Sequence, residues 1–282
     1  MNRCKWSCSL LLFALLTVPG EGRAAGFEDF VRLQPGADGS PAALEVAIAA
    51  FADDEGRRVD LVSAVHVAER DYFRELDRRL ADYPVVLYEL VGDPDAVRAP
   101  PSSPSLSAVG MLQGGMKNAL GLAYQLEGID YDRDNMVHAD LTADEFATSM
   151  RERGESLVGL MFRAWALALA EQGAGAGQQA DLMRVLFADD RQLALKRMLA
   201  SQLAEQAELL QRMAGDDGST LIEVRNARAL DRLRDELDRG ATRTAIFYGA
   251  AHMPDIAARL ADEFGMRPAG TEWIEAWNLR PR

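Results

Sequence analysis

The chain has 282 residues, of which 48% are hydrophobic and 27% are charged, and its formal net charge is −13. This balance is ordinary for a globular protein that buries a sizeable core. An acidic surface repels phosphate backbones and anionic lipid, which argues against nucleic acid as a partner.

The first residues have the layout of a secretory signal. Arg3 and Lys5 form a short basic start, and an apolar run over 9–18 follows. The run is shorter than the roughly 20 apolar residues of a spanning helix. We therefore expect a signal peptide over 1–24 and an exported domain over 25–282, periplasmic or secreted, with no stable membrane insertion; a retained anchor is the alternative. Both cysteines lie within this first segment, so the exported domain would have no disulfide.

The N-terminal part of the domain has the pattern of a sheet with a crossover helix. Two β-prone runs, 43–51 and 59–67, are joined by a polar link and predict a hairpin. Apolar residues at helical spacing predict a helix over 70–81, and a strand-like run follows over 85–91. Strand, helix, strand is the unit that builds a parallel sheet.

The middle of the chain has a different character. After a loop rich in proline and serine, nearly all of 107–214 has helical periodicity with few β-branched residues. We interpret 107–214 as a mainly helical insertion subdomain.

The sheet pattern returns near the C-terminus. We expect a strand over 220–224, a helix that ends near 237, a strand over 244–249, a helix over 254–264 and a last strand-like piece over 271–279. The fold class is therefore α/β, with a mixed sheet formed from both ends of the chain and the helical insertion between them.

Two of the three histidines stand in matching corners. His66 and His252 each follow a β-prone run and small residues, and a helix comes next, which suggests an internal duplication. In open α/β sheets ligands collect at the carboxyl ends of strands, where both histidines would lie. A single histidine at such a point is more often a hydrogen-bonded structural residue. Two in matching corners favour a functional pair.

With two further motifs, these corners resemble the TraB/GumN/Tiki family. The motifs are Glu89 at the end of VVLYEL, after the first corner, and Arg225-Asn226 in EVRNARALDRL, before the second. The resemblance implies an erythromycin-esterase/ChaN-like fold and a divalent-metal-dependent peptidase using Mn, Co or Zn. It also implies that His66 and His252 are metal ligands, that Glu89 is a ligand or general base, and that Arg225 and Asn226 hold substrate or stabilise developing charge.

The chain departs from the family pattern at two positions. Ser63 stands where the family usually has glycine, which narrows the approach to the backbone, and Val224 stands where members often have glutamate. Two imidazoles and a carboxylate nevertheless form a usual catalytic metal shell, because they leave a position for water. No HExxH motif is present, so an ordinary zincin is excluded.

The third histidine lies in an acid-rich passage, GIDYDRDNMVHADL. His138 and Asp134 could reach a metal, and Arg133 could bind substrate. Against this, 140–144 has the pattern of a helix start with an N-cap, and acidic turns are mostly solvated.

Three functions remain open at this point. The first is an exported metal-dependent hydrolase, with a peptide or protein as substrate. The second is a non-catalytic periplasmic binding protein for peptide, haem or metal, and the third is a partner in envelope or polysaccharide assembly. Glu89 beside two histidines favours catalysis, whereas Ser63 and Val224 favour binding.

Overall fold

The computed structural model describes residues 25–93, 120–155, 185, 187–214 and 220–281. The expected signal peptide over 1–24 and a large part of the expected helical insertion lie outside these residues. Among the residues that are described, no helix is both long enough and apolar enough to cross a bilayer.

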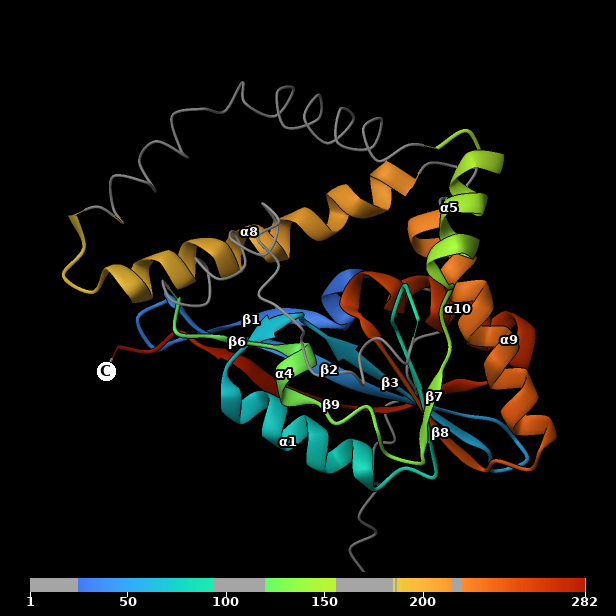
Figure 1. Cartoon of the computed structure of the whole chain (residues 1–282). Helices are drawn as coiled ribbons and strands as arrows, with labels where there is room; N and C mark the ends of the chain where they lie inside the picture. Colours follow the sequence, from blue (N-terminus) through green and yellow to red (C-terminus); the bar gives the residue numbers. More distant parts are fainter. Residues whose placement is uncertain (1–24, 94–119, 156–184, 186, 215–219, 282) are drawn as a thin grey trace, which may run out of the picture.

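A mixed sheet of seven strands forms the centre of the fold (Figure 1). Its strands are β1 (Val31–Pro35), β2 (Pro41–Ala52), β3 (Arg58–Ala64), β5 (Val85–Tyr88), β7 (Met136–His138), β8 (Arg243–Gly249) and β9 (Arg267–Asn278). Strands β3, β8, β5 and β7 are parallel neighbours in that order. Strand β2 is antiparallel to β9 along one edge, and β1 and β3 share its other edge.

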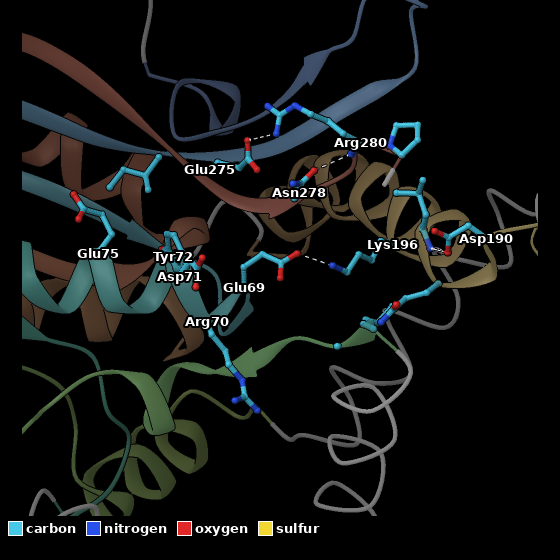
Figure 2. Close-up of a pocket in the computed structure, with 16 residues that line it drawn as sticks. Glu69, Arg70, Asp71, Tyr72, Glu75, Asp190, Lys196, Glu275, Asn278 and Arg280 are labelled. Atoms are coloured by element: carbon cyan, nitrogen blue, oxygen red, sulfur yellow. Dashed lines mark hydrogen bonds and ion pairs between the residues drawn. The ribbon is translucent and has the colours of Figure 1, made fainter.

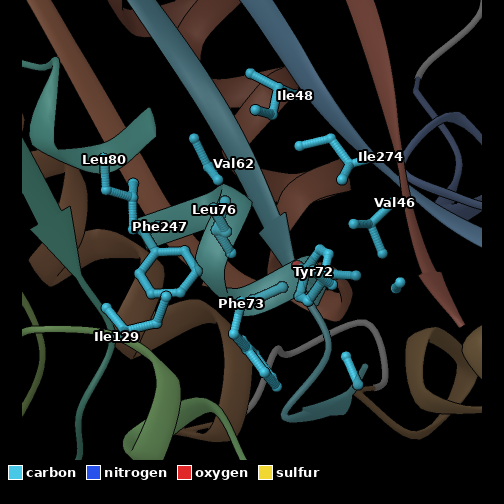
Figure 3. Packing of buried hydrophobic residues seen from close by; sticks show 14 of the residues in the cluster. Val46, Ile48, Val62, Tyr72, Phe73, Leu76, Leu80, Ile129, Phe247 and Ile274 are labelled. Carbon is cyan, nitrogen blue, oxygen red and sulfur yellow. The ribbon is translucent and has the colours of Figure 1, made fainter. Parts of the chain in front are cut away.

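Helices cover both faces of the sheet. Helix α1 (Arg70–Ala81) buries Tyr72, Phe73, Leu76 and Leu80 against one face, as Figure 3 shows. Helices α9 (Arg225–Asp238) and α10 (Met253–Phe264) pack on the other. Side chains alternate along β8, so Phe247 joins the α1 core and its two neighbours join the α9–α10 core. Each fully buried side chain of this size contributes about 1.5–3 kcal/mol.

Several sequence-based predictions are confirmed. The hairpin is β2–β3, the first helix covers Arg70–Ala81, and β3 and β5 run parallel on either side of β8. Because β8 comes from the C-terminal part of the chain, the sheet is indeed built from both ends.

The strand expected over 220–224 is wrong. Thr220–Val224 is a π-helical turn that leads directly into α9. The β-branched residues favoured a strand, but no turn residue separates them from the helix that follows. Thr220 is fixed by its backbone N–H, which donates to the carboxylate of Glu155, and by its hydroxyl, which bonds Ser149. Tertiary contacts therefore overrode the local propensity.

The interpretation of 107–214 as mainly helical missed a strand. Helices α5 (Ala143–Glu152) and α8 (Arg191–Ala214) are helical as expected, and Thr142 is the N-cap of α5. Met136–His138, however, is β7 of the main sheet, paired with β5. The remaining short elements are η1 (Phe27–Asp29), β4 (Val67–Ala68), β6 (Ala123–Tyr124), α4 (Gln125–Gly128) and η4 (Ala250–His252). The β4–β6 pair places Gln125 directly beside the first histidine corner.

Candidate functional site

Four neighbouring parallel strands have their carboxyl ends on the same side of the molecule, and a candidate functional side chain follows each of them. His66 follows β3, His252 follows β8, Glu89 follows β5 and Asp140 follows β7. In open α/β sheets, ligands bind at the carboxyl ends of the strands. The prediction that both histidines follow the carboxyl ends of strands is confirmed, and the two strands are neighbours in the sheet.

The backbone of Gly249, the last residue of β8, lies at the centre of this group. A Cβ atom added there would be 3.1 Å from Oε2 of Glu89, 3.5 Å from Nε2 of His66 and 3.8 Å from Cδ2 of His252. Glycine keeps this space open, because a Cβ atom would crowd Glu89 and contact both histidine rings. The bare backbone and the three side chains are called the Gly249 cluster below.

His66 is exposed and is held from behind by Gln125. Nδ1 of His66 lies 3.0 Å from Oε1 of Gln125, and the Gln125 backbone N–H donates to the His66 carbonyl oxygen. The Gln125 side chain is buried, and its Nε2 donates to the hydroxyl of Tyr131 at 2.9 Å. An amide oxygen at Nδ1 requires a proton on Nδ1, which leaves the lone pair on Nε2, the atom beside Gly249.

His252 is buried and is held in the same way by Asn226. Nδ1 of His252 lies 2.6 Å from Oδ1 of Asn226, and Nδ2 of Asn226 donates to the carboxylate of Asp255 at 2.7 Å. A carboxylate accepts hydrogen bonds, so this contact fixes which end of the amide faces His252. In both histidines an amide oxygen therefore holds Nδ1; Nε2 of His66 lies beside Gly249, and Nε2 of His252 lies 3.5 Å from Oε1 of Glu89 and 3.4 Å from Nη1 of Arg225.

Glu89 and Asp140 flank the guanidinium of Arg225. Nη2 of Arg225 donates to Oε1 of Glu89 and to Oδ2 of Asp140, each at 2.6 Å, and Nε donates to Oδ1 of Asp140 at 2.9 Å. The second oxygen of Glu89 accepts from the backbone N–H of Gly249 at 2.6 Å. Asp140 is fully buried, and its ion pair with Arg225 fixes the position of the guanidinium.

The charges of this group are coupled. Burial of Glu89 opposes its ionisation, but its contact with His252 and the charge of Arg225 outweigh burial and hold its pKa well below the usual range. Burial also opposes the charge on Arg225, but Asp140 and Glu89 raise the pKa of Arg225 above its ordinary value. Glu89 and Arg225 are therefore both charged at neutral pH.

The donor atoms of the Gly249 cluster suit a divalent metal. Nε2 of His66, the ring of His252 and Oε2 of Glu89 all lie within 4 Å of the position that a Cβ atom on Gly249 would take, and imidazole nitrogens and carboxylate oxygens bind Zn, Co or Mn. In the described part of the chain, however, no three His, Cys, Asp or Glu side chains are already close enough to hold an ion. Each oxygen of Glu89 accepts one hydrogen bond and keeps a second lone pair that could bind an ion.

The structure places the candidate residues of the acid-rich passage in other contacts. Nε2 of His138 lies 2.7 Å from the carbonyl oxygen of Leu90, and its ring packs on Tyr88. Arg133 pairs with Asp77 on α1, and Asp134 is exposed. His138 ends β7 but bonds the backbone, which fits the structural interpretation better than the ligand interpretation.

Two residues of the site were not found from the sequence as functional groups. Asp140 was interpreted as part of a helix start, and recognition of β7 would have placed it at a strand end. Gln125 lies 59 positions from His66 in sequence, and no motif marks it. Asn226 was expected to hold substrate, but its side chain is fully buried and holds His252 and Asp255.

Ser63 and Val224, the two residues that differ from the family pattern, have the following surroundings in the structure. Ser63 is buried in β3 beside Tyr248 of β8, and its hydroxyl makes no hydrogen bond to the described residues. Val224 ends the π-helical turn before Arg225. Neither residue reaches into the Gly249 cluster by any contact that the structure records.

A cavity of about 720 Å³ is separate from the two histidines, neither of which lines it. It is bounded by the start of α1, the start of α8 and the end of β9, as Figure 2 shows. Its wall carries an ion pair at 2.5 Å between Lys196 and Glu69, and Glu69 follows His66 by three residues. Strand β9 runs in the same direction as β3. The cavity at the C-terminal end of β9 therefore lies toward the same ends of the strands as the Gly249 cluster.

No family model, curated protein or solved structure matches this chain. The case for a function therefore rests on the geometry of the Gly249 cluster and on the order of the motifs.

Proposed function

We propose that this chain is an exported metal-dependent hydrolase that cleaves an acyl bond, with a peptide bond as the first candidate. One observation supports it most: two histidines at adjacent strand ends, each held at Nδ1 by an amide, lie against the bare backbone of Gly249 beside Glu89. Membership in the TraB/GumN/Tiki family, a ChaN-like fold with a helical insertion and a signal peptide belong to the same proposal.

His66, His252 and Glu89 would hold the divalent ion. When bound, such an ion polarises a carbonyl group and lowers the pKa of bound water. Gln125 and Asn226 keep the two rings from rotating and keep their lone pairs on Nε2, as outer partners of metal ligands do. They are positioning residues and do not touch substrate.

Arg225 is the group that would meet developing negative charge. Asp140 and Glu89 fix its guanidinium, and its Nη1 lies 3.4 Å from Nε2 of His252, next to the cluster. A cation fixed before the reaction stabilises an oxyanion without reorganisation. Glu89 has both oxygens engaged, so we assign it as a ligand and orienting group and not as the general base.

The cavity lined by Glu69 would hold the rest of the substrate. Its volume of about 720 Å³ is within the range of small-ligand sites. Its charged wall suits a peptide better than an apolar substrate, because polar groups at both ends of a peptide segment need partners.

A binding protein for peptide, haem or metal is the second candidate. The observation in its favour is the closed hydrogen bonding of Glu89, which accepts from Arg225 and from Gly249. A site that keeps these bonds would hold a ligand without turnover. A role as an assembly partner draws no support from any contact described above.

Cleavage of a peptide library separates the two candidates. The chain from residue 25 onward is loaded with manganese, cobalt or zinc and compared with the His66→Ala/His252→Ala variant. The hydrolase proposal predicts cleavage that requires the ion and is lost in the variant. Peptide binding without cleavage in every metal form would favour the binding protein.

A further inference from the structure

A second cavity lies at the amino ends of the parallel strands, opposite the Gly249 cluster. Its volume is about 570 Å³, and Arg58 and Arg243, the first residues of β3 and β8, line it. Gly249 is the last residue of β8, and seven residues of strand span about 20 Å. The cavity is therefore well separated from the Gly249 cluster, and nothing in the proposed hydrolase uses it.

Arg58 and Arg243 are directly opposite each other in the parallel pair β3–β8. Like charges at such positions destabilise a sheet. One buried carboxylate serves both: Nε of Arg58 donates to Oδ1 of Asp60 at 2.8 Å, and Nη2 of Arg243 lies 3.6 Å from Oδ2. Asp60 also accepts from the hydroxyl of Tyr83 at 2.8 Å. Two guanidinium groups thus share one negative charge.

The other two arginines of the cavity have carboxylates of their own. Arg78 pairs with Glu75 and Asp82, and Arg79 pairs with Glu75 and Glu272. Arg58 and Arg243 are therefore the two arginines of the cavity that share a single carboxylate, Asp60.

Both of these arginines are partly exposed. The Arg58 side chain donates a hydrogen bond through Nε, and Arg243 stacks at 4.2 Å on the ring of Tyr83 and contacts its hydroxyl. Their side chains are 48% and 43% exposed. The apolar side chains of Ile48 and Ala50, from β2, line the same cavity.

We propose that this cavity binds a small organic anion, whose carboxylate or phosphate group pairs with Arg58 and Arg243 and whose apolar part lies against Ile48 and Ala50. Guanidinium groups bind planar anions through two parallel hydrogen bonds, and the cavity has the volume of a small-ligand site. An anion would also relieve the repulsion between the two arginines. The rest of the chain is acidic, with a net charge of −13, so such a site would stand out from its surroundings.

Calorimetric titration of the metal-free chain tests this proposal. The probes are hexanoate, hexyl phosphate and, as an uncharged analogue, hexanamide. The variants are Arg58→Gln and Arg243→Gln, and Arg232→Gln is the matched control, because Arg232 is also 43% exposed and pairs with Asp235 at 3.7 Å on the surface. We expect at least one anion to bind the wild type and the Arg232→Gln control alike, about tenfold or more weakly to either cavity variant, and hexanamide not to bind.

Three outcomes would overturn the proposal. The first is that neither anion binds the wild type at millimolar concentration, and the second is that hexanamide binds as tightly as hexanoate. The third is that Arg232→Gln weakens binding as much as Arg243→Gln, which would show a general charge effect. Circular dichroism of each variant confirms that it is folded, and none of these results depends on metal or hydrolysis at the Gly249 cluster.

Discussion

The two histidine corners have the same local design but different surroundings. In both, a parallel strand ends in small residues, a histidine follows, and an amide side chain holds Nδ1. His252 is 4% exposed and contacts the Arg225 network, whereas His66 is exposed and is held by Gln125 alone. The helices that follow, α1 and α10, pack on opposite faces of the sheet.

Because the two corners differ in burial, substitutions in them should have different effects on stability and on ligand binding. The His252 corner is part of the core, so changes there alter both folding and the site. The His66 corner lies at the surface, so changes there alter the site with little effect on folding. The predictions below test this division, from the largest expected effect to the smallest.

Removal of Arg225 should have the largest effect on stability. Arg225→Ala leaves the buried carboxylate of Asp140 without its cation, and breaking a buried ion pair costs about 3–5 kcal/mol. Arg228→Ala is the control on the same helix, because its pair with Glu145 is partly exposed and contributes about 1 kcal/mol or less. Urea unfolding measures both. Equal losses in the two variants would contradict a structural role for the buried network.

Substitution of the two amide side chains that hold the histidines compares the two corners directly. Asn226→Ala leaves Asp255 and His252 without a buried partner and should lower the free energy of unfolding by about 1–3 kcal/mol. Gln125→Ala should lower it less. Both should weaken metal binding by about 10–100-fold. Isothermal titration with zinc checks the second part, with Gln34→Ala on β1 as control. Unchanged zinc affinity in Gln125→Ala would remove that residue from the site.

A methyl group at Gly249 should affect the point that both corners share. In Gly249→Ala the new carbon lies 3.1 Å from Oε2 of Glu89, which must shift slightly, and fills the space 3.5 Å from Nε2 of His66. We expect about tenfold weaker metal binding and a loss of about 1 kcal/mol in stability. The result that would count against the cluster is full metal affinity with a normal unfolding curve.

The smallest effect is expected at Ser63. Its buried hydroxyl makes no hydrogen bond to the described residues, so Ser63→Ala removes a polar group without breaking a contact. Stability should stay within about 1 kcal/mol of wild type or rise slightly. A loss above about 2 kcal/mol in thermal or urea unfolding would show that the hydroxyl has a partner in the folded protein.

The sequence predicted those features that local patterns determine. His66, His252 and Glu89 each stand directly after a β-prone run, and adjacent strand ends bring such residues together. Asp140 was missed because β7 has only three residues in the structure, too few for a period of two to show. Gln125 was missed because its contact with His66 is made by the fold, and Thr220–Val224 was misjudged because tertiary contacts outweighed β-branched propensity.

Metal analysis of the purified chain tests the central claim most directly. Wild type, His66→Ala/His252→Ala and His138→Ala are each loaded with manganese, cobalt or zinc, dialysed and measured by elemental analysis. His138 is the matched control, because its Nε2 contacts the Leu90 carbonyl oxygen instead of the Gly249 cluster. The account predicts about one ion per chain in wild type and in His138→Ala, and none in the double variant. No retained ion in wild type, or equal metal content in the double variant, would contradict a metal site at the paired histidines.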